Sequence, residues 1–312
     1  MLETGFFLRL AGLAGLLLTL FWPGPVDAQV YTYEDEDGIV HFTDKPPYER
    51  DDYKTLGGNH RQGPVRMFNA GTSREPEWTF YNRLNGPVEI EVRLEEAENV
   101  TTRPRLPSRF VLPPRQEVRP FQVIPADERS GFSYRLTSRQ VPGDPGARHD
   151  RQAEYLPPFA PGETFTVGQA FGGSFSHNEP ENYHAVDIGM PVGTSIHAAR
   201  AGVIMDIERE FTDGGDDRDR YAEKANYIRI LHEDGTMATY AHLDFRGTVV
   251  FPGQVVLEGE KIGRSGETGF VTGPHLHFVV HRNAGMRLQS VPFRFTTPDG
   301  RQEPKRGMRL ER

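Results

Sequence analysis

Two histidines stand two residues apart in the segment TGPHLHF, which ends at Phe278. If Leu276 to Val280 is a strand, its side chains alternate. His275 and His277 then share one face, while Leu276 and Phe278 share the other. Two imidazoles on one face of a sheet, with apolar residues on the opposite face, are what a shallow metal site requires. The alternative is a pair of solvent-exposed strand histidines, and segments upstream bear on the choice.

Three more segments with the residue types of a catalytic site precede TGPHLHF. They are, in order, SFSHNEPENYHAVDIGMPVGT, TYAHLD and GRSGETG. Together the four segments resemble the LytM/lysostaphin-type family of zinc metallopeptidases, which cleave peptide cross-bridges in peptidoglycan. The resemblance covers about residues 165–285. The resemblance depends on the spacing of the four segments, on the Gly-Thr pair after Asp187 and on the Gly-Pro-His-Leu-His run.

The resemblance implies one Zn²⁺ ion per chain, held by two histidines and one aspartate. Asp187 and His277 match two of these ligands directly. The first histidine departs from the usual pattern, because the position four residues before the aspartate holds Tyr183. Two candidates remain open, His184 and His177, which lie three and ten residues before Asp187.

Backbone geometry favours His177 as the third ligand. In an extended chain, residues at odd separations face opposite sides, so His184 would point away from Asp187. His177 lies in the turn-rich loop SHNEPEN, which can fold back without obeying strand alternation. A bulge near Asp187 would reverse this preference.

The resemblance also assigns two histidines that do not bind the metal, His242 and His275. Two His and one Asp leave zinc a fourth position for water, as in catalytic sites. Zinc lowers the pKa of that water toward about 7. We expect His275 to be the general base and His242 to stabilise the oxyanion or pass a proton to the leaving amine, although the roles could be exchanged. His281, four residues after His277, could line the same groove, but a structural role is favoured.

Composition excludes several classes of protein. The chain contains no cysteine, which rules out disulfides, thiolate zinc sites and a cysteine nucleophile. An exported protein without disulfides suits a bacterial periplasm or cell surface. The formal net charge of −8 argues against a nucleic-acid partner, because phosphate binding relies on clusters of Lys and Arg.

Residues 1–28 are predicted to be a secretory signal peptide. Arg9 precedes the apolar run LAGLAGLLLTLFW, and Ala28 is the expected cleavage edge. About 13 apolar residues are fewer than the roughly 20 that span a bilayer. Glu3 and the single arginine leave an uncleaved anchor open, and no later segment is apolar enough to cross a membrane. We therefore predict a periplasmic or cell-envelope location in a Gram-negative bacterium.

The mature chain is predicted to be mainly β, with two modules before the peptidase-like region. Residues 29–60 read as a small β-hairpin module with a turn at Asp37-Gly38, and they resemble an N-terminal module of bacterial exported proteins whose function is not established. Residues 61–140 are predicted to be an immunoglobulin-like β-sandwich, because Val88, Ile90 and Val92 alternate with charged residues.

The remaining segments follow from composition. Residues 141–152 are predicted to be a linker and residues 153–298 an all-β, antiparallel-sheet peptidase domain with an open groove. Residues 299–312 are predicted to be a disordered tail. The acidic insert DGGDDRDR, between Phe211 and Tyr221, is expected to be a solvated loop.

The function predicted from the sequence is an exported zinc metalloendopeptidase that hydrolyses peptide cross-links of peptidoglycan. Its partners would be peptidoglycan stem peptides, and a regulatory protein partner stays open. The alternative is a catalytically inactive LytM-type module that binds the cell wall and activates another hydrolase. A third idea, sugar binding through Trp78 and Tyr81, is weaker because these aromatics fit a core.

Overall fold

The computed structural model describes residues 30–34, 40–43, 54–56 and 63–312. The predicted signal peptide, residues 1–28, lies outside this part of the chain. Near the N-terminus, β1 (Val30–Glu34) pairs antiparallel with β2 (Val40–Thr43) and with β3 (Lys54–Leu56). The described residues are almost entirely strands and turns, which confirms the predicted mainly β fold class.

The middle unit, residues 63–143, contains two three-stranded sheets and a two-stranded sheet. The strand orders are β4-β5-β9, β11-β6-β8 and β10-β7. Apolar residues of both three-stranded sheets form one buried cluster, which includes Phe80, Ile90 and Leu112. Its immunoglobulin-like character stays a prediction. The strands are β4 (Val65–Asn69), β5 (Trp78–Asn82), β6 (Val88–Glu98), β7 (Val100–Arg103), β8 (Ser108–Leu112), β9 (Glu117–Val118), β10 (Gln122–Pro125) and β11 (Ser133–Pro142).

The C-terminal unit, residues 153–312, is built on a nine-stranded sheet. Its order is β19-β15-β17-β18-β22-β13-β12-β26, and β23 pairs with β22 beside this path. The strands of this sheet are β12 (Thr164–Gln169), β13 (Val186–Gly189), β15 (Gly202–Glu208), β17 (Tyr227–Leu231), β18 (Met237–Ala241), β19 (Val255–Val256), β22 (His275–Asn283), β23 (Leu288–Ser290) and β26 (Arg309–Glu311).

Shorter elements surround this sheet. Three two-stranded sheets are formed by β14 (Ser195–His197) with β20 (Lys261–Arg264), β16 (Gly214–Gly215) with β21 (Gly269–Phe270), and β24 (Phe295–Thr297) with β25 (Gly300–Gln302). The acidic insert contains β16 and the one-turn helix α1 (Arg218–Tyr221), so it is a structured flap rather than a plain loop. The part of the chain that the structure describes contains no helix of the length and apolar character that crossing a bilayer requires.

The predicted disordered tail is wrong, because residues 299–312 are part of the C-terminal unit. β26 pairs with β12 at the edge of the large sheet, and Leu310 is fully buried. Residues 300–302 form a hairpin with β24. A three-residue edge strand is held by main-chain hydrogen bonds and one apolar side chain. Its sequence therefore shows none of the periodicity that longer strands display.

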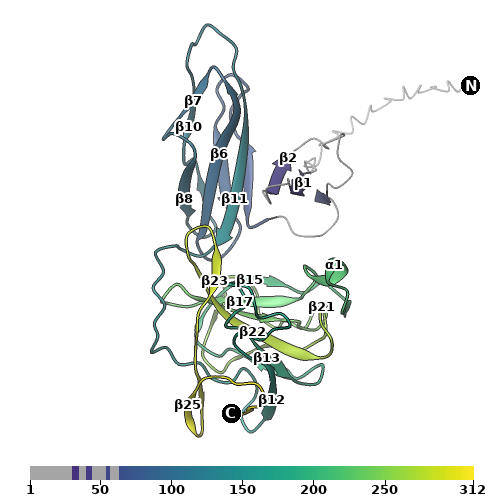
Figure 1. Ribbon diagram of the computed structural model, residues 1–312. Helices are drawn as coiled ribbons and strands as arrows, with labels where there is room; N and C mark the ends of the chain where they lie inside the picture. Colours follow the sequence, from purple (N-terminus) through teal and green to yellow (C-terminus); the bar gives the residue numbers. More distant parts are fainter. Residues whose placement is uncertain (1–29, 35–39, 44–53, 57–62) are drawn as a thin grey trace, which may run out of the picture.

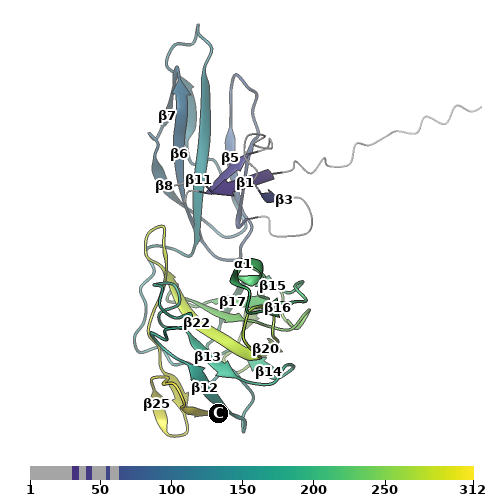
Figure 2. The same ribbon diagram turned by 45° about the vertical axis from the view of Figure 1, so that its right-hand side comes forward.

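The middle unit lies directly above the C-terminal unit in Figures 1 and 2, and buried contacts join the two units. The predicted linker, residues 141–152, begins inside β11, where Val141 pairs with Glu89. Met205 and Met237 of the C-terminal unit belong to the buried cluster of the middle unit. Glu89, only 3% exposed, accepts hydrogen bonds from Asn283 Nδ2 at 2.9 Å and from the Met286 backbone N–H at 2.7 Å.

Candidate metal centre and groove

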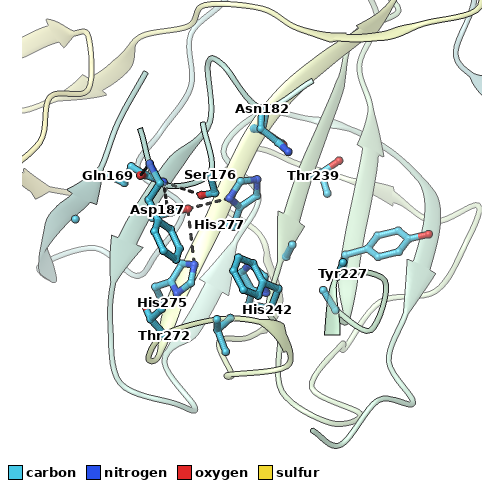
Figure 3. Close-up of a pocket in the computed structure, with 18 of the residues that line it drawn as sticks. Gln169, Ser176, Asn182, Asp187, Tyr227, Thr239, His242, Thr272, His275 and His277 are labelled. Atoms are coloured by element: carbon cyan, nitrogen blue, oxygen red, sulfur yellow. Dashed lines mark hydrogen bonds and ion pairs between the residues drawn. The ribbon is translucent and has the colours of Figure 1, made fainter. Parts of the chain in front are cut away.

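Asp187 and His277 are brought together by strand register. β13 and β22 are antiparallel neighbours, and Asp187 lies directly opposite His277. Directly opposed residues point to the same face of a sheet. His277 Nδ1 accordingly lies 2.8 Å from Asp187 Oδ1, as Figure 3 shows. The alternation predicted for β22 is also present, because Leu276 and Phe278 are fully buried on the opposite face.

A third side chain, that of His177, reaches Asp187 and His277 from the loop between β12 and β13. This loop folds back on itself through a hydrogen bond from the His177 N–H to the Gly173 carbonyl at 2.9 Å. His177 Nδ1 donates to the Ala170 carbonyl at 3.0 Å. The ring is fully buried, and its Nε2 lies 3.2 Å from Asp187 Oδ2. The turn-rich loop thus carries the imidazole to the carboxylate without strand alternation.

These three side chains fit a divalent metal ion. One potential ligand atom from each lies within 4.8 Å of the other two. Because a carbonyl only accepts, His177 Nδ1 must carry a proton, and in the tautomer that binds a metal Nε2 offers its lone pair. That buried Nε2 has no hydrogen-bond partner among the described residues. A lone pair facing a carboxylate oxygen needs a cation between them, and two imidazoles with one carboxylate are a set that zinc accepts.

The negative charge of Asp187 also suits the binding of a divalent metal ion. Burial by itself would raise the pKa of this carboxyl, but the adjacent His177 and His277 rings hold the pKa well below its usual value. Asp187 Oδ2 also accepts a hydrogen bond from Gln169 Nε2 at 3.0 Å, and the same Nε2 donates to Ser176 Oγ at 2.8 Å. Gln169 therefore fixes the orientation of an ionised carboxylate.

The alternative ligand, His184, lies elsewhere. It precedes β13, so the strand-alternation argument does not apply to it directly. Its backbone N–H donates to Ser290 Oγ at 3.0 Å, its Nδ1 lies 3.2 Å from the Ser290 carbonyl, and its ring packs edge-on against Phe171. Burial lowers the pKa of this imidazole. The structure brings His177 to Asp187 and places His184 against β23.

His242 and His275 flank the group. Their ring centroids are 4.7 Å apart, and the His242 ring lies 5.8 Å from that of His277. His242 Nδ1 donates to the Thr268 carbonyl at 2.7 Å, and His275 Nδ1 donates to the Gly273 carbonyl at 2.8 Å. Nε2 is therefore the remaining ring nitrogen of each histidine, and that of His275 lies 3.7 Å from Asp187 Oδ1. Burial, with smaller effects from His275 and His277, lowers the pKa of His242 to about 3.

The GRSGETG segment holds His242 in place. His242 has φ of 63°, a conformation that non-glycine residues rarely adopt. The Gly266 N–H donates to the His242 carbonyl at 3.0 Å. A Cβ at Gly266 would lie 2.4 Å from the Asp244 backbone nitrogen, so only glycine permits this close approach. The glycine thus clamps the backbone that presents the imidazole.

The group lies in a groove of about 720 Å³ on one face of the large sheet. The floor is formed by side chains of β22, β18 and β17, with Thr239 and Tyr227 extending across the sheet from His277 (Figure 3). The walls come from the loop between β12 and β13, the flap, β21 and the tail, which contribute Phe175, Arg218, Phe270 and Arg306 respectively. His281 also lines the groove, and its Nε2 donates to the Glu181 carbonyl at 3.0 Å.

Sequence reasoning missed several groove residues. Gln169 escaped because it faces Asp187 only through the pairing of β12 with β13, which no local pattern reveals. Arg306 escaped because the tail was predicted to be disordered. Arg229 and Glu181 carry no recognisable motif. The alternation of Tyr227 and Arg229 with buried Ile228 and Ile230 in β17 was the one available signal.

The fold and the site together define a metallopeptidase-like domain, with a His–Asp–His group on the face of an antiparallel sheet. Residues 181–289 match the profile of Peptidase family M23, and residues 17–61 match that of a domain of unknown function, DUF4124. The resemblance to the LytM/lysostaphin-type family that the sequence predicted is thereby confirmed for this part of the chain. The matched range begins after His177.

Similar proteins cover only part of the chain. Peptidoglycan DD-endopeptidase ShyA of Vibrio cholerae serotype O1 is 36% identical over 96 residues, which are 31% of this chain and 19% of that protein. Lysostaphin of Staphylococcus simulans is 29% identical over 133 residues, or 42% of this chain and 23% of that protein. The chain thus spans about a fifth of the length of these curated relatives.

Two solved structures are also similar. The antimicrobial peptidase lysostaphin from Staphylococcus simulans gives a TM-score of 0.30 at 27% identity, covering 45% of this chain and 47% of that chain. A zinc-containing peptidase from Vibrio cholerae gives a TM-score of 0.33 at 15% identity, covering 84% of this chain and 77% of that chain.

Proposed function

We propose that the protein is an exported zinc metalloendopeptidase that hydrolyses peptide cross-links of peptidoglycan. The observation that carries the proposal is the meeting of His177, Asp187 and His277 around one position, with an unpartnered buried Nε2 on His177. Relatives named peptidoglycan DD-endopeptidases support the substrate class. By the same likeness we propose that the bond cleaved joins D-Ala to diaminopimelate.

The metal ligands are proposed to be His177 Nε2, an oxygen of Asp187 and His277 Nδ1, with one zinc ion per chain. Zinc held there would supply a Lewis acid that lowers the pKa of water toward about 7 and polarises a peptide carbonyl. Gln169 and the Ala170 carbonyl orient these ligands through their hydrogen bonds to Asp187 and His177.

Proton transfer is assigned to His275 and His242. Each ring commits Nδ1 to a backbone carbonyl, so each presents Nε2 as the acceptor. We propose that His275 takes the proton from the attacking water. His242, once it has received a proton, would stabilise the oxyanion or deliver that proton to the leaving amine. Because both rings offer the same free atom, the two roles are exchangeable.

The groove suits an extended peptide, since its floor is one face of a sheet and its walls come from separate segments. A cross-linked polymer can enter an open groove more easily than a closed pocket. The apolar run before Ala28 and the envelope substrate together support export to the periplasm or cell envelope. An inactive module that activates another hydrolase would not need His242 and His275 in addition to the ligand group.

The test is digestion of purified sacculi by the full chain, followed by mass spectrometry of the released muropeptides. We expect Asp187→Ala and His277→Ala to abolish release and to lower the bound zinc measured by metal analysis. His197→Ala is the matched control, since His197 lies outside the groove and donates from Nδ1 to the Gly259 carbonyl at 2.8 Å. Unchanged digestion by either site variant would reject the proposal, whereas stoichiometric zinc without hydrolysis would favour the inactive module.

A further inference from the structure

The groove contains an arginine that the proposed reaction does not use. Arg229 lies on β17, and its side chain is on the groove face, because its neighbours Ile228 and Ile230 are fully buried in the core on the other face. The large sheet places β17 next to β18 and β18 next to β22. Adjacent strands are about 4.8 Å apart, so the backbone of Arg229 is roughly 10 Å from β22.

The guanidinium of Arg229 lies over an aromatic ring. Its Cζ lies 5.2 Å from the centroid of the Tyr227 ring, which is a cation–π contact. Its Nε is buried and has no acceptor within the described residues. An arginine carries five N–H donors, and leaving such donors unpaired in a partly buried position is costly. The side chain is therefore positioned by an aromatic ring, partly buried, and left with an Nε–H that has no acceptor in the described part of the chain.

Two carboxylates lie near Arg229. Asp206 is its register partner on β15, and it accepts a short hydrogen bond from the Tyr227 hydroxyl. Burial raises the pKa of Glu181, while the charges of Arg229 and then His277 lower it. Within the described ranges, neither carboxylate forms an ion pair with Arg229. Neither carboxylate therefore forms the ion pair that would occupy the guanidinium.

The other cations of the groove are less suited to a specific contact. Arg218 lies over the Phe270 ring at 5.5 Å, and Arg306 belongs to the tail; both are exposed. Exposed ion pairs contribute little, because water and salt screen them. A partly buried, fixed guanidinium binds a carboxylate more strongly and in a defined geometry. Arg229 is therefore the member of this group with the best geometry for recognition.

We propose that Arg229 is a specificity-determining residue that binds a free carboxylate of the substrate peptide. This inference rests on the proposed peptidase function and names a substrate group for the same groove. The register places Arg229 level with Val279, two residues along β22 from His277, so the span from His277 is roughly 12 Å. This equals about three to four extended residues, so the carboxylate would lie within about four residues of the scissile bond. Cross-linked stem peptides have free carboxylates at such positions, whereas an internal glycine bridge does not.

The experiment compares two soluble cross-linked muropeptides, one with free carboxylates and one with those carboxylates amidated. With the full-length, zinc-loaded protein we expect the acid form to be cleaved with at least tenfold higher kcat/KM. Arg229→Gln should lower kcat/KM for the acid form by about 10- to 100-fold, the loss expected for one charge-assisted hydrogen bond. The amidated form should change less than about threefold, so the preference disappears.

Controls keep the result interpretable. Arg220→Gln removes the same charge from an exposed arginine of α1 that does not line the groove, and it should leave the preference unchanged. Arg229→Lys keeps the charge but not the planar fork, and it should recover part of the preference. If Arg229→Gln does not fold by circular dichroism, Arg229→Lys carries the test, with a loss of preference of at least threefold expected.

A second measurement separates the two proposals. Binding of the acid and amidated muropeptides to the metal-free full chain is measured by calorimetry, where the acid form should bind at least tenfold more tightly. If the wild type cleaves neither muropeptide, the peptidase proposal fails, while the binding preference still tests Arg229. If the wild type cleaves both forms and Arg229→Gln discriminates as the wild type does, the carboxylate subsite is refuted.

Discussion

Replacing Glu89 by alanine tests whether the middle and C-terminal units form one cooperative structure. Glu89 Oε2 accepts from Asn283 Nδ2 and from the Met286 N–H, and the residue is 3% exposed. A hydrogen bond to a charged group contributes about 1.5–3 kcal/mol, and its loss leaves a buried donor without a partner. Asn283 Nδ2 keeps a second acceptor, the Gly143 carbonyl at 3.0 Å. We therefore expect a loss of about 3 kcal/mol in the free energy of unfolding.

The assay is urea unfolding of the full chain, followed by circular dichroism and by tryptophan fluorescence. Trp78 reports on the middle unit, where its Nε1 donates to the Tyr134 hydroxyl at 2.8 Å. In the wild type both signals should follow one transition, because Met205 and Met237 of the C-terminal unit are buried in the core of the middle unit. In Glu89→Ala the transition should move to lower urea and broaden.

The matched control is Glu98→Ala, at the exposed far end of the same strand. Surface substitutions usually change stability by no more than about 0.5 kcal/mol. A Glu89→Ala variant that stays within that range would refute the argument that this contact joins the two units.

Four further outcomes are expected. Gly266→Ala should lower sacculus hydrolysis at least tenfold, because the new Cβ would displace the backbone of Asp244 and the neighbouring His242. Chelation of the metal should lower the melting temperature of the wild type but not of Asp187→Ala, as scanning calorimetry would show. Removal of residues 304–312 should lower the melting temperature, because it uncovers the edge of β12 that pairs with β26. Burial lowers the pKa of His232 to about 4, so the unfolded chain binds the proton more readily, and the contribution of His232 to stability, present above about pH 6.5, should fall by about 1.6 kcal/mol between pH 6.5 and 5.

Each of these outcomes has a control or a contradicting result. His232→Asn, which keeps a donor for the Ala201 carbonyl, should make the pH dependence of urea unfolding shallower by that amount, while the buried His242 and His281 keep their own contributions. An equally steep dependence would exclude His232 as a contributor. Gly131→Ala, where a Cβ meets nothing within 4 Å, controls for a glycine replacement. Equal melting temperatures of the wild type with and without chelator would contradict the expectation on the metal. Equal melting temperatures with and without residues 304–312 would contradict the expectation on the tail.

Several side chains that come together at the candidate site could be singled out from local sequence, because they lie in short segments with strong constraints. The two-residue spacing of His275 and His277 places both on one face of a strand in any register. The turn-forming residues around His177 were enough to predict that its loop can fold back toward Asp187. The pairing of Asp187 with His277, in contrast, joins strands 90 residues apart, and only the family resemblance suggested it.

Contacts between distant segments could not be predicted. Alternation in β6 indicated that Glu89 and Glu91 face solvent, yet both are buried. Glu89 is covered by the turn between β22 and β23, and Glu91 by Arg93 and Arg109, with ion-pair distances of 2.7 and 2.9 Å. A buried carboxylate is tolerated where its partners are supplied, and those partners are specified by tertiary structure.

The shared core between the units has a practical consequence for work with fragments. Cutting the chain near residue 150 to isolate the C-terminal unit would expose Met205 and Met237 to water and would leave Asn283 without Glu89. The excised piece would carry a new apolar patch, prone to self-association. Its groove would also lose the support that steadies the far end of β22. Rates obtained with such a fragment would describe an altered molecule, so full-length protein is the appropriate reference.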